Sequence, residues 1–361
     1  MRVALVHEFL TQLGGAEKLL EVFHEMFPEA PVYTLFYDRQ RTGGRFEGWD
    51  IRPSFLQNIP GALAHYKWFL PLMPRAIERF DLTGFDLVLS DSSAFAMGAK
   101  KSPNSTHICY CHTPTRYIWE NHEEYIANLP YPKIVKMLAH IYIKNHQASW
   151  DLATSKRPDF FIANSKTVQD RIKKYYGRNS TVIYPPVDTD FFTIGTGVKQ
   201  EYFLTGSRLE PYKKIELVVE AFNELGLPLK VVGTGTEAES LKRKAKNNIE
   251  FFGRVSDAEL RALYQGARAF VFPALEDAGL MTLEALACGT PVIGLARGGT
   301  PEFVTDGKNG VLFENQTSEE IIAAVKRFES MSFDADKLRE SALPFDKAKF
   351  KAHILEFIRT R

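Results

Sequence analysis

Short apolar runs alternate with longer segments of helical periodicity along the whole chain. In the first half, apolar runs bounded by polar turn residues predict strands at residues 2–7, 31–36, 85–90, 106–111 and 159–163. Between them, apolar residues that recur every three or four positions predict helices, notably at residues 16–27, 132–155 and 166–176. Strands that alternate with helices indicate a parallel sheet covered by helices on both faces.

The alternation stops at residues 184–188 and then begins again. Pro185 and Pro186 lie in this stretch and interrupt both helices and strand ladders. A second set of apolar runs predicts strands at residues 202–205, 229–232, 249–252, 269–272 and 291–294. We therefore expect two doubly wound α/β domains, residues 1–187 and 188–344, and an amphipathic helix over residues 345–361.

The composition excludes some classes of protein. Of 361 residues 25% are charged, and the formal net charge of +1 argues against a protein that wraps nucleic acid. No signal peptide is expected, and no apolar run approaches the roughly 20 residues that span a bilayer. Three cysteines cannot build a disulfide framework, so we expect a cytoplasmic protein. Cys109 and Cys111 alternate in an apolar run and are expected on one face of a strand.

The first candidate for chemistry is the segment 276–284, which follows the strand predicted at 269–272. Glu276 lies in the turn, Gly279 opens a helix, and Glu284 lies inside that helix. The free amides at the helix start, those of Gly279, Leu280 and Met281, favour an anion. The two carboxylates are suited to accept hydrogen bonds from sugar hydroxyls. On spacing alone, a capping acid and a surface acid explain the pattern equally well.

The second candidate is the segment 206–214, at the end of the strand predicted at 202–205. In open α/β sheets, ligands bind beyond the carboxyl ends of the strands. Arg208 and Lys213 are therefore placed to clamp a diphosphate, the arginine through two parallel hydrogen bonds and the lysine as a point charge. A solvated basic loop is the alternative.

Together these segments resemble the donor site of family 4 glycosyltransferases, which are retaining enzymes of the GT-B fold. The Glu-x7-Glu pattern of that family matches at Glu276 and Glu284, and its Arg-Leu-x3-Lys pattern matches from Arg208 to Lys213. Further matches are the glycine pair after the first strand and the histidine after the strand at 106–111, namely Gly14, Gly15 and His112. The resemblance runs over essentially the whole chain. Ala278 departs from it, because the family usually has phenylalanine there, and this puts the shape of the sugar pocket in doubt.

The resemblance implies an α/β protein of GT-B type, with two Rossmann-like domains facing across a cleft and the final helix crossing back to the first domain. It implies transfer from a nucleotide-diphosphate sugar with retention, without a metal and without a cofactor. The residues implied as catalytic are His112, Arg208, Lys213 and Glu276. Those implied in donor binding are Gly14, Gly15, Gly279, Leu280, Met281 and Glu284, with Glu276 facing the sugar and Glu284 the ribose.

The donor and acceptor are expectations from resemblance as well. The segments 112–117 and 208–222 look like a mannosyltransferase branch that builds bacterial polysaccharides, so we favour GDP-mannose, with UDP-sugars as the alternative. The acceptor expected is a saccharide or a lipid-linked saccharide. Two rivals remain: a catalytically silent sugar-nucleotide module, and a nicotinamide-dependent oxidoreductase, whose fingerprint should follow the first strand.

Three motifs resemble other sites. Asp188 and Asp190 form an Asp-x-Asp pattern, but they follow the proline pair, and the pattern formed by Asp334 and Asp336 lies in a polar stretch. The glycines at 233 and 235 imitate a dinucleotide fingerprint in the wrong half of the chain, so a helix-entry turn lining the nucleotide cleft explains them better.

The segment 133–157 combines basic and apolar residues, with Asp151 as its only acid. A basic amphipathic helix of this kind is typical of an anionic membrane surface, and Trp68 and Phe69 beside Lys67 favour that interpretation. A helix that faces the core and exposes a solvated basic side is the alternative. The first interpretation predicts a peripheral location on the inner face of the cell membrane.

Overall fold

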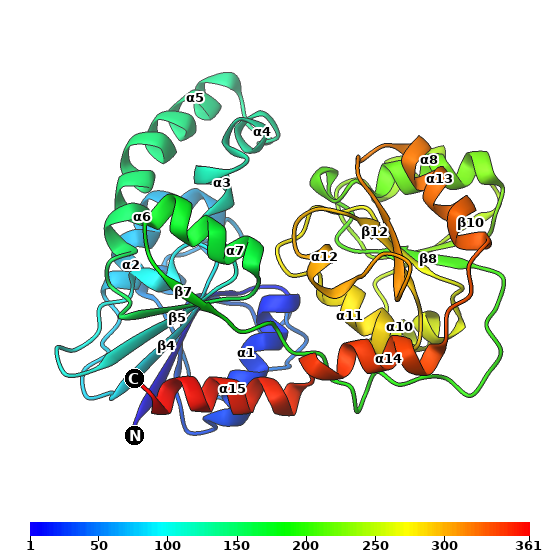
Figure 1. Cartoon of the computed structure of the whole chain (residues 1–361). Coiled ribbons are helices and arrows are strands. Elements are labelled where there is room, and N and C mark those ends of the chain that lie inside the picture. The colour runs from blue at the N-terminus through cyan, green and yellow to red at the C-terminus, as the bar shows by residue number, and fades with distance from the viewer. The chain divides into compact units, whose positions relative to one another are not determined.

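The computed structural model describes residues 1–361, which divide into two compact units (Figure 1). Unit 1 comprises Met1–Ile183 and His353–Arg361, and unit 2 comprises Tyr184–Ala352. Each unit contains one parallel sheet with helices on both faces, so the predicted doubly wound α/β architecture is confirmed. None of the helices combines the length and apolar character that crossing a bilayer requires.

The sheet of unit 1 has seven strands in the order β3-β2-β1-β4-β5-β6-β7, all paired in parallel. The chain winds outward one way from β1 to β3 and then the other way from β4 to β7. The topological switch point therefore lies between β1 and β4. The strands are β1 (Val3–Leu10), β2 (Val32–Tyr37), β3 (Ile51–Pro53), β4 (Leu87–Ser92), β5 (Thr106–Cys111), β6 (Phe160–Ala163) and β7 (Ser180–Val182).

The helices of unit 1 are α1 (Gly15–Met26), α2 (Met73–Glu78), α3 (Arg116–Trp119), α4 (His122–Ala127), α5 (Lys133–Tyr142), α6 (Ala148–Thr154) and α7 (Lys166–Arg171). Short 3-10 helices occur at Phe55–Asn58, Tyr66–Leu72 and Ala96–Gly98. The helix predicted at 132–155 consists of α5, a π-helical turn at Ile143–Gln147 and α6. A second π turn, Ile172–Tyr176, follows α7.

The sheet of unit 2 has six parallel strands in the order β10-β9-β8-β11-β12-β13. Its switch point lies between β8 and β11, because the chain winds one way from β8 to β10 and the other way from β11 to β13. The strands are β8 (Phe203–Gly206), β9 (Leu229–Val232), β10 (Ile249–Gly253), β11 (Phe270–Phe272), β12 (Val292–Leu295) and β13 (Gly310–Phe313).

Two apolar clusters hold the faces of this second sheet. Successive strand residues alternate between them: Val271 packs with α8 and α13, whereas Phe270 packs with α10, α11 and α14. The helices are α8 (Ile215–Leu225), α9 (Ala238–Lys244), α10 (Asp257–Gly266), α11 (Leu280–Ala287), α12 (Thr300–Phe303), α13 (Ser318–Glu329) and α14 (Ala335–Ala342). Further 3-10 turns occur at Pro211–Lys213 and Leu343–Phe345.

The last helix, α15 (Lys347–Arg359), is shared by the two units. Its residues up to Ala352 group with unit 2, and those from His353 onward group with unit 1. In unit 1 the Phe357 ring meets the ring of Phe160 edge-on, with 6.2 Å between centroids. The helical spacing of the apolar residues in this segment thus produces a buried stripe.

Candidate active site

The turn between β11 and α11 carries Glu276 and the start of the helix. Gly279 caps α11 with a left-handed backbone (φ +63°), which a side chain would strain. The Thr282 hydroxyl donates to the Gly279 carbonyl at 2.6 Å, so this capping turn is fixed. The amides at the start of α11, including those of Leu280 and Met281, lie in the first turn, where no intrahelical acceptor exists.

A second glycine pair, Gly298 and Gly299, packs against the backbone of this turn and was not predicted from the sequence. The Gly299 amide donates to the Glu276 carbonyl at 2.8 Å. A Cβ on Gly298 would lie 2.4 Å from the same carbonyl oxygen, and a Cβ on Gly299 would lie 2.5 Å from that of Asp277. Only glycine fits at both positions. The signal was a Gly-Gly pair that follows the strand predicted at 291–294 after three further residues.

Lys213 and Glu276 form an ion pair, although 63 residues separate them in the sequence. Lys213 is buried and Glu276 is partly buried. Lys214 has φ +57° and is the only residue other than glycine with a positive φ, a conformation that costs about 1–2 kcal/mol. This turn ends the 3-10 helix Pro211–Lys213 and starts α8, so the backbone strain lies beside the lysine that contacts Glu276.

Arg208 is exposed on the loop after β8. Its guanidinium donates to the Tyr212 hydroxyl at 2.6 Å and lies 5.9 Å from the centroid of that ring. The Lys213 ammonium lies 5.0 Å from the same ring. Tyr212 thus contacts both cations of the predicted diphosphate clamp and keeps them on one side of unit 2.

The glycine turn at 233–235 supports the loop of Arg208. The Leu209 amide donates to the Thr234 carbonyl at 2.9 Å, and the Glu237 amide donates to the Leu209 carbonyl at the same distance. A Cβ on Gly235 would lie 2.2 Å from the Leu209 carbonyl oxygen. These glycines therefore permit close approach of two backbone segments just before α9.

Glu284 is buried in α11, where the Tyr264 hydroxyl donates to its Oε2 at 3.3 Å. Burial raises the pKa of Tyr264 well above its usual value, and the nearby Glu284 raises it further. Tyr264 therefore stays a neutral donor and holds the glutamate in one orientation. Ala278 is also buried, one residue before the cap of this helix.

In unit 1, the loop after β1 carries the first glycine pair. Gly14 precedes α1, accepts a hydrogen bond from the Lys18 amide at 3.0 Å, and leaves Gly15 exposed at the first position of the helix. A Cβ on Gly14 would lie 3.1 Å from the Glu17 carboxylate. The glycine therefore makes room for a buried acid in the first turn of α1.

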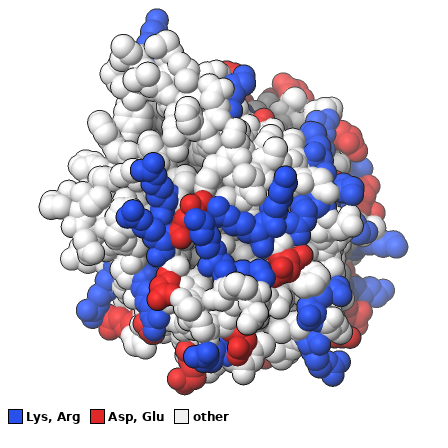
Figure 2. All heavy atoms as spheres, turned by 90° about the vertical axis from the view of Figure 1, so that its left-hand side faces the viewer, with Lys and Arg blue, Asp and Glu red and all other residues white.

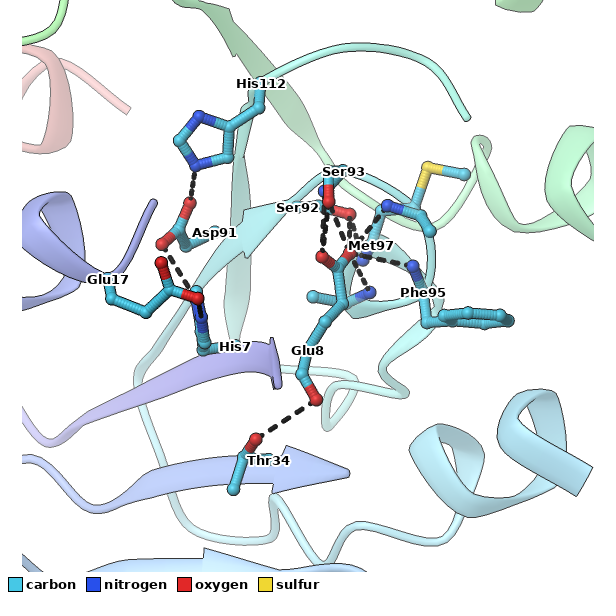
Figure 3. A network of polar contacts seen from close by, with 12 residues as sticks. His7, Glu8, Glu17, Thr34, Asp91, Ser92, Ser93, Phe95, Met97 and His112 are labelled. Carbon is cyan, nitrogen blue, oxygen red and sulfur yellow. Dashed lines mark hydrogen bonds and ion pairs between the residues drawn. The ribbon is translucent and has the colours of Figure 1, made fainter. Parts of the chain in front are cut away.

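His112 directly follows β5 and belongs to a buried polar network (Figure 3). The pairing of β1 with β4 sets His7 opposite Asp91. The Asp91 carboxylate pairs with the Nδ1 of His7 at 2.9 Å through one oxygen and with the Nε2 of His112 through the other. The Glu17 carboxylate lies 3.9 Å from the Nε2 of His7. Figure 3 shows the other ring nitrogen of His112 pointing away from Asp91.

This network favours charged forms. Burial alone would lower the pKa of His7, but Asp91 and Glu17 outweigh it and raise that pKa to about 10. Burial would raise the pKa of Asp91, whereas His112 and His7 lower it to about 2. For His112, burial lowers the pKa, and the Asp91 carboxylate more than compensates, so its pKa is raised. Asp91 therefore stays ionised and stabilises a protonated His112.

A second buried acid, Glu8, organises the loop after β4. Its carboxylate accepts hydrogen bonds from the backbone amides of residues 93–96 at 2.7–3.1 Å and from two serine hydroxyls, those of Ser92 and Ser93. His7, Glu8 and Asp91 were not among the residues predicted from the sequence. Their signal was the presence of ionisable residues at the ends of otherwise apolar strands.

The discounted motifs have structural partners. Asp188 accepts from the Phe191 amide at 3.0 Å and from the Lys347 ammonium at 3.1 Å. Asp334 caps α14 through the amides of Asp336 and Lys337. Asp188 and Asp334 therefore each have a structural role in a turn or a helix start.

Two family models match this chain. The model described as glycosyltransferase family 4 matches residues 13–191, and the model described as glycosyl transferases group 1 matches residues 186–343. Together they cover residues 13–343, which is most of both units. By these two matches the chain belongs to the glycosyltransferase families that the models describe, and its fold is of the GT-B type. The first match contains Gly14, Gly15 and His112, and the second contains Arg208 and the Glu-x7-Glu segment.

Curated relatives of this GT-B glycosyltransferase are similar over part of their length. A probable sucrose-phosphate synthase of Thermosipho melanesiensis is 31% identical over 182 residues, 42% of this chain and 43% of the relative. A GDP-mannose-dependent α-(1-6)-phosphatidylinositol monomannoside mannosyltransferase of Mycolicibacterium smegmatis is 29% identical over 220 residues, 50% of this chain and 58% of the relative. The matches thus span about half the length of these relatives.

Solved structures are similar over the whole chain. HepE of Anabaena in complex with UDP has a TM-score of 0.72 at 17% identity, and both chains are covered fully. The sucrose-phosphate synthase of Thermosynechococcus elongatus has a TM-score of 0.76 at 16% identity, covering 100% of this chain and 99% of the other. At such identities the likeness shows the GT-B fold alone.

Proposed function

We propose that this glycosyltransferase moves a sugar from a nucleoside-diphosphate donor to an acceptor hydroxyl with retention and without a divalent metal. The observation that carries the proposal is the Lys213–Glu276 ion pair at the switch point of unit 2. The loops after β8 and β11 emerge at the same edge of that sheet, where doubly wound folds bind ligands. A cationic clamp and a sugar-binding acid thus lie together.

The proposed chemistry follows from what these groups stabilise. Departure of the nucleoside diphosphate leaves extra negative charge on its outer phosphate. Arg208, Lys213 and the amides at the start of α11 oppose that charge as it develops. A lysine and an arginine supply the positive charge that a metal supplies elsewhere. The protonated form of His112, which the Asp91 carboxylate favours, supplies a further hydrogen-bond donor for the donor sugar or its phosphate.

For retention we favour attack on the same face as departure. The leaving phosphate oxygen takes the acceptor proton as the new glycosidic bond forms and the bond to phosphate breaks. The alternative is a short-lived covalent adduct on a carboxylate. Proton NMR of the first product tests retention, because an inverted anomeric signal contradicts it.

We propose GDP-mannose as the donor, with UDP-sugars as the alternative. The mycobacterial relative named for GDP-mannose supports the first, whereas the HepE neighbour was solved with UDP. A panel of nucleotide sugars, scored for transfer, hydrolysis and protection against thermal unfolding, tests the choice. Turnover separates an enzyme from a silent binding module, and protection by NAD instead of GDP or UDP would indicate an oxidoreductase.

We propose that the acceptor is a lipid-linked saccharide at an anionic membrane surface, with a peripheral location on the inner face of the cell membrane. The support is α5, which has no buried residue. Ile134 is 64% exposed and Leu138 58% exposed, so the alternative of a core-facing apolar side is wrong for α5. Figure 2 shows the face of the molecule on which α5 lies. The upper part of that face is largely uncharged, and Lys and Arg side chains gather in its middle and lower parts.

Vesicle sedimentation tests the membrane proposal. Because apolar burial and basic charge both contribute, binding should require anionic phospholipid and weaken with salt. The double variant Met137→Ser and Leu138→Ser should lose most of the binding, because it removes two exposed apolar side chains of α5. Since neither side chain is buried, the substitutions should leave the fold intact. Val198→Ser, which changes an exposed apolar residue of unit 2, is the control. Equal binding of all three proteins would contradict a role of α5.

A further inference from the structure

Two histidines and a glutamate come together where α4 meets α5, outside the candidate active site. The Nε2 of His122 lies 2.9 Å from the Nδ1 of His140, and the ring centroids are 4.8 Å apart. One ligand atom from each of these residues and from Glu123 lies within 4.8 Å of the others. Both histidines are partly buried, and Glu123 is exposed.

The backbone fixes the tautomer of His122. Its Nδ1 lies 3.0 Å from the Tyr117 carbonyl oxygen. Because a carbonyl only accepts, the Nδ1 of His122 carries a hydrogen, and the Nε2 is the ring nitrogen that faces His140. Histidines that bind metals typically have their second nitrogen held in this way, which fixes the ring and raises the basicity of the ligand atom.

The hairpin formed by α4 and α5 has no apolar core of its own. Neither helix contains a buried residue. A hydrogen bond from the Lys136 ammonium to the Ala127 carbonyl at 2.5 Å joins the two helices, and the Tyr125 ring of α4 stacks on Tyr117 with 5.0 Å between centroids. Small elements that cannot bury enough apolar surface commonly rely on a metal or a disulfide.

We propose that His122, His140 and Glu123 bind one divalent cation of the zinc type, which ties α4 to α5. Tetrahedral Zn²⁺ with bonds of about 2.0–2.1 Å sets two ligand nitrogens roughly 3.3 Å apart, so the rings need to separate by only a few tenths of an ångström. Water completes the coordination. Imidazole nitrogens select Zn²⁺ over Mg²⁺ and Ca²⁺, which prefer oxygen ligands.

The test uses the full chain after removal of metal with a chelator. Competition with a zinc indicator should give one equivalent of bound Zn²⁺, and Zn²⁺, unlike Mg²⁺, should raise Tm. The variants His122→Gln and His140→Gln should each bind at least about tenfold more weakly and lose the Zn²⁺-dependent rise, because each removes a direct ligand. Comparing each variant with and without metal separates this effect from any general loss of stability.

His146→Gln is the matched control, because His146 is exposed on the π turn after α5 and stacks on Tyr142. It should bind Zn²⁺ as the unaltered chain does. Co²⁺ bound in place of Zn²⁺ should give the intense visible absorption of a four- or five-coordinate site. Either of two results overturns the proposal. The first is no Zn²⁺-dependent rise in the Tm of the unaltered chain, in which case the two rings form a plain hydrogen bond. The second is equal affinity for Zn²⁺ in all three variants.

Discussion

Replacing Asp91 with asparagine removes one charge from the network of unit 1 and keeps its shape. The carboxylate lies between His7 and His112 and accepts from both. An asparagine offers one acceptor oxygen and one donor amide, so it cannot accept from both imidazoles. At least one buried ring then either loses its partner or must accept from the asparagine amide as a neutral imidazole.

The expected loss of stability is large because Asp91 is buried. Its pKa of about 2, lowered by His112 and His7 against the effect of burial, indicates a carboxylate that is ionised in the folded state throughout the neutral range. Removing one partner of a buried ion pair costs roughly 3–5 kcal/mol. For a unit of this size, this corresponds to a fall in Tm of roughly 6–20 °C.

The loss should depend on pH in a defined direction. Because the pKa of His7 is raised from 6.5 to about 10, the folded chain keeps a proton that the unfolded chain releases. The resulting stabilisation is complete below about pH 6.5 and disappears as the pH rises toward 10, at up to about 1.4 kcal/mol per pH unit. In Asp91→Asn only Glu17 remains beside His7. The stability difference between the two proteins should therefore shrink from pH 7 to pH 9.

Urea unfolding at pH 7, 8 and 9, followed by circular dichroism, measures this difference. The matched control is Asp170→Asn, the same substitution on the exposed side of α7, which should change stability by less than about 0.5 kcal/mol. The reasoning is refuted if the difference between Asp91→Asn and the unaltered chain stays constant over these pH values, because His7 would then not carry the extra proton.

Three further predictions concern the proposed donor site. Arg208→Ala and Lys213→Ala should each lower kcat/KM by on the order of 100-fold in steady-state kinetics, and full activity in either would remove the diphosphate clamp. Glu276→Gln should lower kcat and keep nucleotide affinity. Glu284→Gln should weaken GDP or UDP binding in calorimetry and raise KM, because the ribose contact expected of Glu284 contributes equally to ground-state and transition-state binding. The reverse pattern would exchange the two roles. Turnover should survive a chelator, and a loss that Mg²⁺ or Mn²⁺ restores would make the metal-independent mechanism wrong.

The sequence predicted strands well where they are buried on both faces. The run at 106–111 is β5 and the run at 229–232 is β9, residue for residue. Of the four edge strands, only β10 was predicted, over residues 249–252, whereas β3, β7 and β13 were missed. The missed β3 contains only Ile51, Arg52 and Pro53, of which the last two are exposed. The missed β13 has a single run of three apolar residues, too short to be distinguished from a loop that packs inward.

Periodicity was less informative about orientation and long-range contacts. The pattern at 133–142 predicted a helix, but it did not show that the apolar side of α5 faces outward, because that depends on what lies opposite. The pair of His7 and Asp91 spans 84 positions and exists only through the register of β1 on β4. Its residues are visible in the sequence, whereas their partnership is not.

The two switch points explain why the candidate residues gather as they do. In unit 1 the strands at the switch point are β1 and β4, and the ionisable residues that interrupt their apolar runs, among them Glu8 and Asp91, lie near their carboxyl ends. In unit 2 they are β8 and β11, and the loops after them carry Lys213 and Glu276. Neighbouring strands at a switch point send their connections in opposite directions, so no helix covers the edge between them. Burying ionisable groups there is costly unless they have partners. Asp91 has His7 and His112, Glu8 has the backbone amides after β4, and Glu276 has Lys213.

The partnership in unit 2 can be tested by replacement. Lys213→Met should destabilise unit 2 by leaving Glu276 without its cation, and Lys213→Met with Glu276→Leu should recover much of that stability without recovering turnover. A double variant as unstable as Lys213→Met would show that the pair is not the source of the cost.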